Sequence, residues 1–315
     1  MILHKNVLEI TSGEITDAVN APLFAQKQHA TEFIKGFRTG ALKQDLRGLL
    51  EFIAPSVRIS ATADNTYGYK IVKGVDDLPM NNHDTMARGE GGEFGYVGSI
   101  DDLAVGKLKN YGLSSAVENK DLEADPAHIQ DVFNRLVNLI DGAKVLKAIN
   151  KLDTIASTNT KQIASIDNPL AVIEEHLNDV SQSAGFMPNR MLVGRGFFIK
   201  LKNQLLNSAN AWAFSAPRTI EELGQSLGVE ILTPKAHYKA GSTLPLIAND
   251  TAYAFVGEEG ISREDLSNLK TFNSGDMDFF EADHPQGRLK ILTVSEYVDI
   301  ATTSAVGASK FKFEN

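Results

Sequence analysis

The sequence is dominated by one long helical pattern, which begins at Asp125-Pro126 and continues through about Ile155. Aspartate is a favoured N-cap residue, and proline is favoured at the first helical position. Apolar residues then recur at the three- and four-residue spacing of a helix. They are Ile129, Val132, Phe133, Leu136, Leu139, Ile140, Ala143, Leu146 and Ile149. The pattern predicts a single rod-like helix of roughly 40 Å, at about 1.5 Å per residue.

The N-terminal fifty residues lack a comparable period. Helices are expected at 22–37 and 42–52, the second ending before Pro55. Apolar and polar residues then alternate at 57–59 and 67–71, which predicts half-buried strands. We therefore expect an N-terminal arm that packs on something else, followed by β structure.

A glycine-rich polar stretch lies between Gly74 and Gly98. One interpretation is a flexible surface loop. The other is an extended two-stranded loop that projects from the body to reach a neighbour, since long structureless loops are rare in compact domains unless they are functional.

Capping signals predict shorter helices downstream of the long one. An Asn-Pro pair at 168–169 opens a helix that Gly185 would end, and a Thr-x-x-Glu capping box at 219–222 opens another that Gly228 would end. Also expected are a helix at 197–206 and strands at 191–193, 229–232, 246–248, 253–256, 288–294 and 297–300, the last two as a pair. The predicted fold class is α+β.

Composition excludes several classes of protein. The chain has 315 residues, 31 Lys and Arg against 40 Asp and Glu, a formal charge of −9 and no cysteine. Disordered, collagenous and disulfide-stapled chains are excluded, as are thiol catalysis and cysteine-ligated metals. The acidic balance argues against a protein that binds nucleic acid through its overall field. The N-terminus lacks the apolar core of a signal peptide, so we expect a protein made and kept in the cytosol.

Motifs that could carry catalysis are weak. Gly194-Arg-Gly196 lies between an expected strand and an expected helix but lacks the third glycine of a dinucleotide-binding loop, which favours a tight turn. Ser267 and Lys270 match a Ser-x-x-Lys spacing without its companion motifs. Trp212 is interpreted as a packing anchor.

Metal-ligand patterns are equally weak. The seven histidines are scattered singly. Two acidic groups could hold a divalent cation or could be solvated segments. They are Asp276, Asp278, Asp283 with His284, and Glu118, Asp121, Glu123 with Asp125. The sequence therefore predicts no catalytic, cofactor-binding or metal-binding residue.

Four segments, in this order, resemble tailed-bacteriophage major capsid proteins. Residues 52–58 (Phe-Ile-Ala-Pro-Ser-Val-Arg) are similar to the family's entry into a strand and a long extended loop, and residues 111–125 to the return from that loop. The helix at 126–155 resembles the family's spine helix. Residues 168–194, which end in Met-Pro-Asn-Arg-Met-Leu-Val-Gly, resemble the helix and turn that follow it.

The resemblance implies an HK97-type capsid fold with four parts. They are an N-terminal arm (1–50), a peripheral domain (51–167), an axial domain (168–280), and a return to the peripheral domain with the C-terminal tail (281–315). The peripheral domain would contain the extended β-hairpin loop (about 60–108) and the spine helix (about 126–155).

The function that the resemblance implies is structural, not enzymatic. The subunit would self-assemble into hexamers and pentamers of an icosahedral shell around double-stranded DNA. Expected partners are further copies, other virion proteins such as portal, scaffolding or decoration protein, and packaged DNA bound without sequence specificity. No cofactor or membrane is expected, and the protein would be found in the virion after assembly in the host cytoplasm.

Two family features do not carry over. Some members cross-link a loop lysine to a neighbour's asparagine, but only Lys70 and Lys73 near the expected loop fit part of that pattern, so no such residues are assigned. Some members have a cleaved N-terminal scaffolding segment. The arm here is too short and retains Met1, so we expect self-assembly or a separate scaffolding protein.

Two alternatives stay open from the sequence. One is an encapsulin-like compartment shell on the same fold. The other is a soluble α+β enzyme or ligand-binding protein whose site the motifs do not reveal.

Overall fold

A computed structural model describes residues 45–60, 64–71, 102–124, 128–165, 167–207, 217, 219–234, 246–259, 266–284 and 287–314. Several expectations lie outside these ranges. They are the helix at 22–37 with most of the arm, the glycine-rich stretch, Lys73, Asp125-Pro126 and Trp212.

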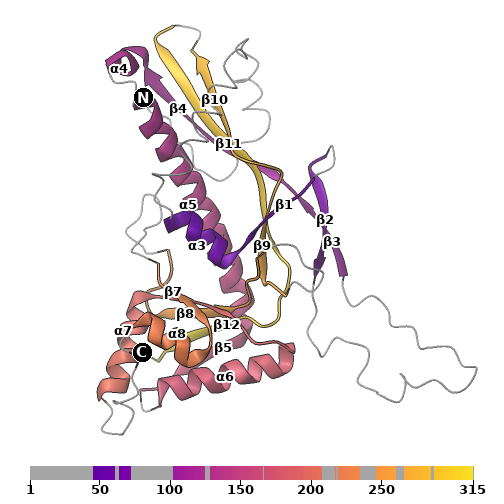
Figure 1. Ribbon diagram of the computed structural model, residues 1–315, viewed down its shortest axis with the longest axis vertical. Coiled ribbons are helices and arrows are strands. Elements are labelled where there is room, and N and C mark those ends of the chain that lie inside the picture. The colour runs from indigo at the N-terminus through magenta and orange to yellow at the C-terminus, as the bar shows by residue number, and fades with distance from the viewer. Residues whose placement is uncertain are drawn as a thin grey trace, which may run out of the picture.

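Helix α5 (His128–Ala156) confirms the long helix, with 29 residues. Its N-terminal half packs through Phe133 and Ile140 into one hydrophobic core. Its C-terminal half packs through Ile149 and Leu152 into a second core. Figure 1 shows α5 running from the upper part of the molecule into the lower part. The helix therefore connects the two parts through separate sets of buried side chains, and it ends in a short 3₁₀ turn, η3 (Ser157–Asn159).

The first sheet has five strands. The longest of them, β11 (Leu289–Thr302), pairs with three of the others. The first half of β11 pairs with β10 (Asp278–Asp283) on one side and with β4 (Lys109–Glu118) on the other. Its last residues pair with β9 (Leu269–Asn273), which in turn pairs in parallel with β1 (Ser56–Arg58). A short helix, α4 (Asn119–Ala124), follows β4.

The predicted strand pair at 288–294 and 297–300 is wrong, because β11 is continuous. Ser295 and Glu296 keep their places in the ladder opposite Gly112 and Tyr111 of β4. Both side chains are buried, and Glu296 accepts a hydrogen bond from Lys144. The polar pair therefore interrupts the apolar pattern without forming a turn.

The second sheet has the strand order β5-β12-β8-β6-β7. These strands are β5 (Thr160–Ile163), β12 (Ser309–Phe313), β8 (Thr251–Phe255), β6 (Arg190–Val193) and β7 (Glu230–Leu232). Three helices share a core with one face of this sheet. They are α6 (Pro169–Ala184), α7 (Arg195–Asn207) and α8 (Ile220–Leu227).

The predicted caps of α6 and α8 are confirmed. The Asn168 side chain accepts a hydrogen bond from the Leu170 amide at 3.1 Å, and the Thr219 hydroxyl accepts one from the Glu222 amide at 3.2 Å. Gly185 and Gly228 end the two helices with φ of 83° and 68°, the left-handed region that glycine tolerates.

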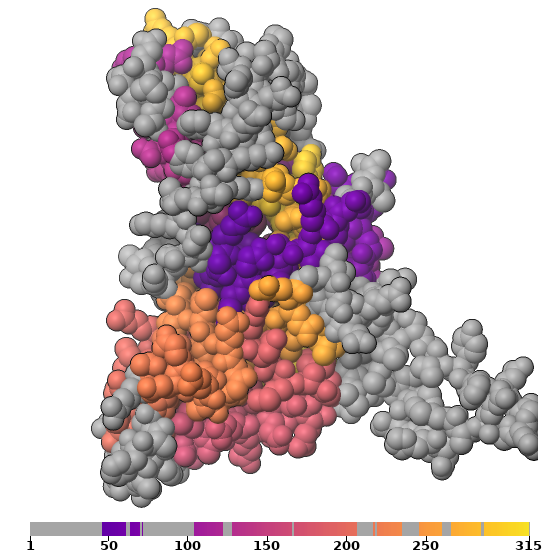
Figure 2. Space-filling view, viewed as in Figure 1, coloured from indigo at the N-terminus to yellow at the C-terminus, as the bar shows by residue number. Residues whose placement is uncertain are grey.

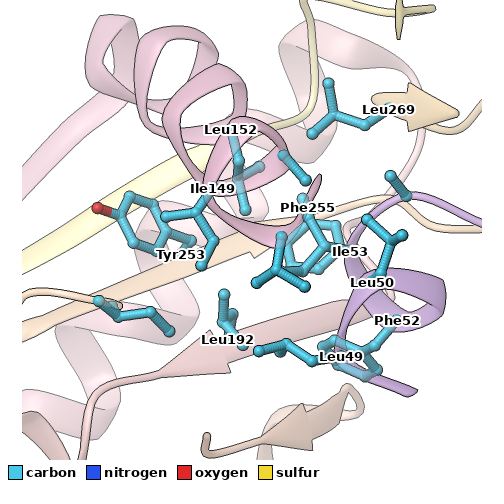
Figure 3. Packing of buried hydrophobic residues seen from close by; sticks show 14 of the residues in the cluster. Leu49, Leu50, Phe52, Ile53, Ile149, Leu152, Leu192, Tyr253, Phe255 and Leu269 are labelled. Carbon is cyan, nitrogen blue, oxygen red and sulfur yellow. The ribbon is translucent and has the colours of Figure 1, made fainter. Parts of the chain in front are cut away.

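Helix α3 (Asp45–Ile53) and the end of α5 cover the other face of the second sheet. Figure 3 shows Leu49, Leu50 and Ile53 of α3 packed near Ile149, Leu192 and Phe255. The rings of Phe52 and Phe255 meet edge to face with centroids 5.7 Å apart. The predicted strand at 246–248 is wrong: Leu246 and Ile247 are buried here, but the chain turns so that the Thr251 amide reaches the Ala248 carbonyl.

A separate two-stranded element consists of β2 (Thr66–Ile71) and β3 (Asp102–Lys107). The strands pair antiparallel over their full length, from Thr66 opposite Lys107 to Ile71 opposite Asp102. This confirms the strand expected at 67–71. Figure 1 shows the pair beside the first sheet. Among the helices in the described ranges, none is both long and apolar enough to cross a membrane.

Candidate functional sites

The β2–β3 pair meets the first sheet through an aromatic cluster. The Tyr67 ring lies 4.7 Å from the Phe272 ring of β9, and the Tyr69 ring lies 5.6 Å from it, centroid to centroid. Tyr67 is buried, and Gly106 of β3 lies directly beside its ring, where a Cβ atom would be 2.3 Å from Cζ. The hairpin thus packs on β9 through a ring that requires glycine on the paired strand.

A carboxylate on β11 links this hairpin to α5. The Tyr67 hydroxyl donates to Asp299 Oδ2 at 3.0 Å, and Lys147 Nζ of α5 donates to Asp299 Oδ1 at 3.2 Å. Lys147 also donates to the Tyr111 hydroxyl of β4 at 3.0 Å. We call these four residues the hairpin junction: Tyr67, Tyr111, Lys147 and Asp299.

The electrostatics of the hairpin junction keep its groups in fixed protonation states. Burial, reinforced by Asp299, raises the pKa of Tyr67 far above its ordinary value. Burial would lower the pKa of Lys147, but Tyr111 and Asp299 outweigh it and raise that pKa. Tyr67 is therefore a neutral donor and Lys147 a cation at neutral pH, which suits a structural link and not proton transfer.

A second polar cluster is buried between α5 and β11. Lys144 Nζ lies 2.7 Å from Asp141 Oδ1 and 2.7 Å from Glu296 Oε2, and all three side chains are less than a tenth exposed. Burial alone would lower the pKa of Lys144, but the two carboxylates raise it. Removing one member of such a cluster leaves an uncompensated buried charge.

A third cluster surrounds Arg190 of β6. Its Nη1 donates to the carbonyls of Phe52 at 2.9 Å and Glu51 at 3.2 Å, at the end of α3. Its guanidinium also lies 5.2 Å from the centroid of the Phe52 ring and within 3.4 Å of Glu230. Arg190 therefore satisfies the last carbonyls of α3 and fixes that helix on the second sheet.

Gly194 is the single residue between β6 and α7, and Gly196 is the second residue of α7, so the chain passes tightly from strand to helix where a turn was predicted. A Cβ atom on either would lie 2.7 to 2.8 Å from the Asn249 carbonyl oxygen. The Gly196 amide donates to Asn249 Oδ1 at 3.0 Å, so a side chain of this protein occupies the place at the start of α7 that a phosphate would take in a nucleotide site.

The Ser267 and Lys270 pair also has a structural role. The Ser267 hydroxyl accepts a hydrogen bond from the Glu258 amide at 2.8 Å, and Lys270 Nζ donates to the Glu258 carbonyl. Both side chains therefore bind the backbone of Glu258, one at its amide and one at its carbonyl.

The two acidic groups do not converge in the described chain. Asp278 and Asp283 lie at opposite ends of β10, and Glu118 pairs with Lys120 at 2.6 Å on the surface. No group of three possible ligands is close enough to hold a metal ion among the described residues.

Sequence reasoning missed all three polar clusters. A signal was present for one: Asp141 and Lys144 are three residues apart on α5, between apolar positions of the buried face. The partners of Asp299 and Arg190 come from distant segments, and nothing in the local sequence indicates them.

Neither a family model nor a curated protein matches the sequence. Solved structures do match in fold. A phage-related protein from Bordetella bronchiseptica matches at 16% identity over 86% of this chain and 95% of its own, with a TM-score of 0.58. A virus-like particle from Pyrococcus furiosus matches at 14% identity over 86% and 97%, with a TM-score of 0.51. The capsid structure of Cyanophage P-SCSP1u matches at 10% identity over 84% and 88%, with a TM-score of 0.52.

These matches span most of both chains, so the fold is shared over most of this chain. At such low identities the likeness concerns the fold. It confirms the predicted α+β class and the fold resemblance to phage capsid proteins.

Proposed function

We propose that the chain is the major capsid protein of a tailed bacteriophage, built on the HK97-type capsid fold. The observation that carries the proposal is the match in fold to a cyanophage capsid over 84% of this chain and 88% of that one. The match to a phage-related bacterial protein over 95% of its length supports the same assignment.

The described geometry suits a subunit whose parts reach neighbouring copies. In this proposal β2 and β3 are the base of the extended loop at about 60–108, and α5 is the spine helix of a peripheral domain. The hairpin junction connects the β2–β3 pair to α5 through Asp299. Paired strands with open edges can add contacts to an adjacent chain by strand addition.

The division into arm (1–50), peripheral domain (51–167), axial domain (168–280) and return with C-terminal tail (281–315) is part of the same proposal. Subunits would form hexamers and pentamers of an icosahedral shell around double-stranded DNA. Portal, scaffolding or decoration proteins would be further partners, and the virion the final location. With no cysteine in the chain, the shell would depend on burial, hydrogen bonds and ion pairs.

The acidic charge is consistent with a container. A formal charge of −9 disfavours tight binding to the packed DNA, so the genome would slide along the inner wall. A particle whose inner surface binds DNA tightly at physiological salt would contradict this part of the proposal.

The test is assembly of the purified full chain, alone and together with the scaffolding protein from the same genome. Light scattering should detect particles far larger than the 34.2 kDa subunit, and electron microscopy should show closed shells. A discrete species of tens of kilodaltons under every condition would favour a soluble enzyme or binding protein instead.

A cellular compartment shell is the second candidate, favoured by the match to the virus-like particle from Pyrococcus furiosus. The contents of particles isolated from the native source distinguish the two. Nuclease-protected double-stranded DNA of uniform length supports the phage capsid, whereas an enclosed cargo protein without DNA supports the compartment.

A further inference from the structure

Helix α7 has an outer stripe that the fold does not bury. Its inner residues Phe197, Leu201 and Leu205 are in the core of the second sheet. On the outer side, Ile199 and Leu206 are 48% and 49% exposed, seven residues apart on one face of the helix. Exposed apolar side chains that share one face and are rimmed by polar residues are typical of interaction surfaces.

The same stripe is basic. Arg195, Lys200 and Lys202 are the charged residues of α7, and the helix contains no Asp or Glu. Arg195 and Lys202 fall on the stripe, four residues before Ile199 and four before Leu206. Arg195 is the first residue of the helix, where the helix dipole disfavours a cation. Helix stability therefore does not explain the charge at this position.

The charged residues of helix α6 have the opposite sign to those of α7. Its charged residues Glu174, Glu175 and Asp179 are all acidic and exposed, and the helix contains no Lys or Arg. The other exposed residues on this outer side are uncharged: Ala171, Asn178 and Gln182. An acidic stripe of this kind is complementary in charge to the basic stripe of α7, and its uncharged positions leave places where apolar side chains can pack.

The two stripes lie on different helices of the same helical layer. Figure 1 shows α7 at the lower left and α6 along the lower edge, and Figure 2 shows the surface of this lower part, where both helices belong. A contact between two different surfaces of identical chains is heterologous, and it closes into a ring when the rotation between copies allows.

We propose that the α7 stripe (Arg195, Ile199, Lys202 and Leu206) docks on the acidic α6 stripe of a second copy of this chain, as the contact that repeats around each ring of subunits. The inference rests on the proposed function, because a shell requires such rings. The apolar side chains supply the buried area, and the charges select the partner face and are screened by salt.

Charge reversal of each stripe, and of both stripes in one chain, tests the pairing. One variant carries Arg195→Glu and Lys202→Glu, and the other carries Glu175→Lys and Asp179→Lys. Each alone should lower the yield of particles at least tenfold while its melting temperature stays close to that of the wild type. A third variant that carries all four substitutions should restore assembly, because each reversed stripe then meets a reversed stripe on the next copy in every ring. The matched control, Arg195→Lys with Lys202→Arg, keeps the charge and should assemble normally.

The outcomes distinguish a failure of this inference from a failure of the proposed function. If the wild type forms particles and both reversed variants do so equally well, the inference is wrong and the proposed function stands. If each variant fails and the variant with all four substitutions folds but also fails, the stripes do not pair with each other, and the inference is again wrong. If the wild type itself never assembles, the proposed function fails.

Discussion

Tyr67 and Asp299 are 232 positions apart in the sequence and are joined by a hydrogen bond of 3.0 Å from the tyrosine hydroxyl to the carboxylate. Asp299 also accepts from Lys147 of α5, so one carboxylate connects the β2–β3 hairpin, the first sheet and the long helix. The direction of the β2–β3 pair is therefore set by partly buried polar contacts as well as by ring packing.

Removing the hydroxyl should weaken this connection measurably. Tyr67→Phe keeps the ring against Phe272 but loses the hydrogen bond, and we expect a loss of about 1 kcal/mol in the free energy of unfolding. Tyr67→Ala also removes the ring and should lose about 3 to 5 kcal/mol. Urea unfolding of the unassembled subunit measures both. An unchanged stability in Tyr67→Phe would show that the hydroxyl contributes nothing, and equal losses in the two variants would show that the ring contributes nothing.

Removing one charged group from the buried cluster around Lys144 should destabilise the fold more than removing the Tyr67 hydroxyl. Lys144→Met leaves Asp141 and Glu296 as two buried carboxylates without their cation, which predicts a loss of about 3 to 5 kcal/mol. Adding Glu296→Gln removes one of the two charges and should recover part of the loss. A double variant less stable than Lys144→Met alone would contradict this description.

The pH dependence of stability should reveal the contribution of ionised Asp153. Burial would raise the pKa of Asp153, but hydrogen bonds from Lys310 and from the Tyr253 hydroxyl outweigh it and lower that pKa below 3.8. The stabilisation is then present above pH 3.8 and is lost as the pH falls through the lowered pKa. The difference in melting temperature between the wild type and Asp153→Asn should be constant near neutral pH and shrink below pH 3.8. A difference that stays constant into that acidic range would contradict the lowered pKa.

Two glycines with positive φ should respond differently to alanine. Gly228 has φ 68° and open space around it, so Gly228→Ala should cost about 1 to 2 kcal/mol from backbone strain alone. Gly307 has φ 81°, and a Cβ atom there would lie 2.6 Å from the Phe186 ring. Gly307→Ala should therefore reduce the free energy of unfolding clearly more than Gly228→Ala does. Chemical denaturation of the two variants compares them, and equal costs would mean that the ring moves away freely.

Local signals in the sequence were sufficient for α5, α6 and α8. The capping residues Asn168 and Thr219 and the closing glycines at 185 and 228 act within a few residues, so the bounds of α6 and α8 follow from them. The apolar spacing of α5 has the same local character. The helix and strand patterns predicted the α+β class, and the structural matches confirm that class and the fold resemblance to phage capsid proteins.

Long-range pairing could not be predicted in the same way. β11 continues through Ser295 and Glu296 because Lys144 of a distant helix neutralises the glutamate and β4 completes the ladder. Arg190 is fixed by carbonyls at residues 51 and 52, far from it in the sequence. These contacts depend on tertiary packing, which overrides the local pattern.

Imaging of the assembled protein by cryo-electron microscopy tests the central claim most directly. The account predicts closed icosahedral shells of hexamers and pentamers, formed by the chain alone or with its scaffolding protein, with α7 of one subunit against α6 of the next around each ring. A population that contains only single subunits or small discrete oligomers, under every condition that keeps the chain folded, would contradict it.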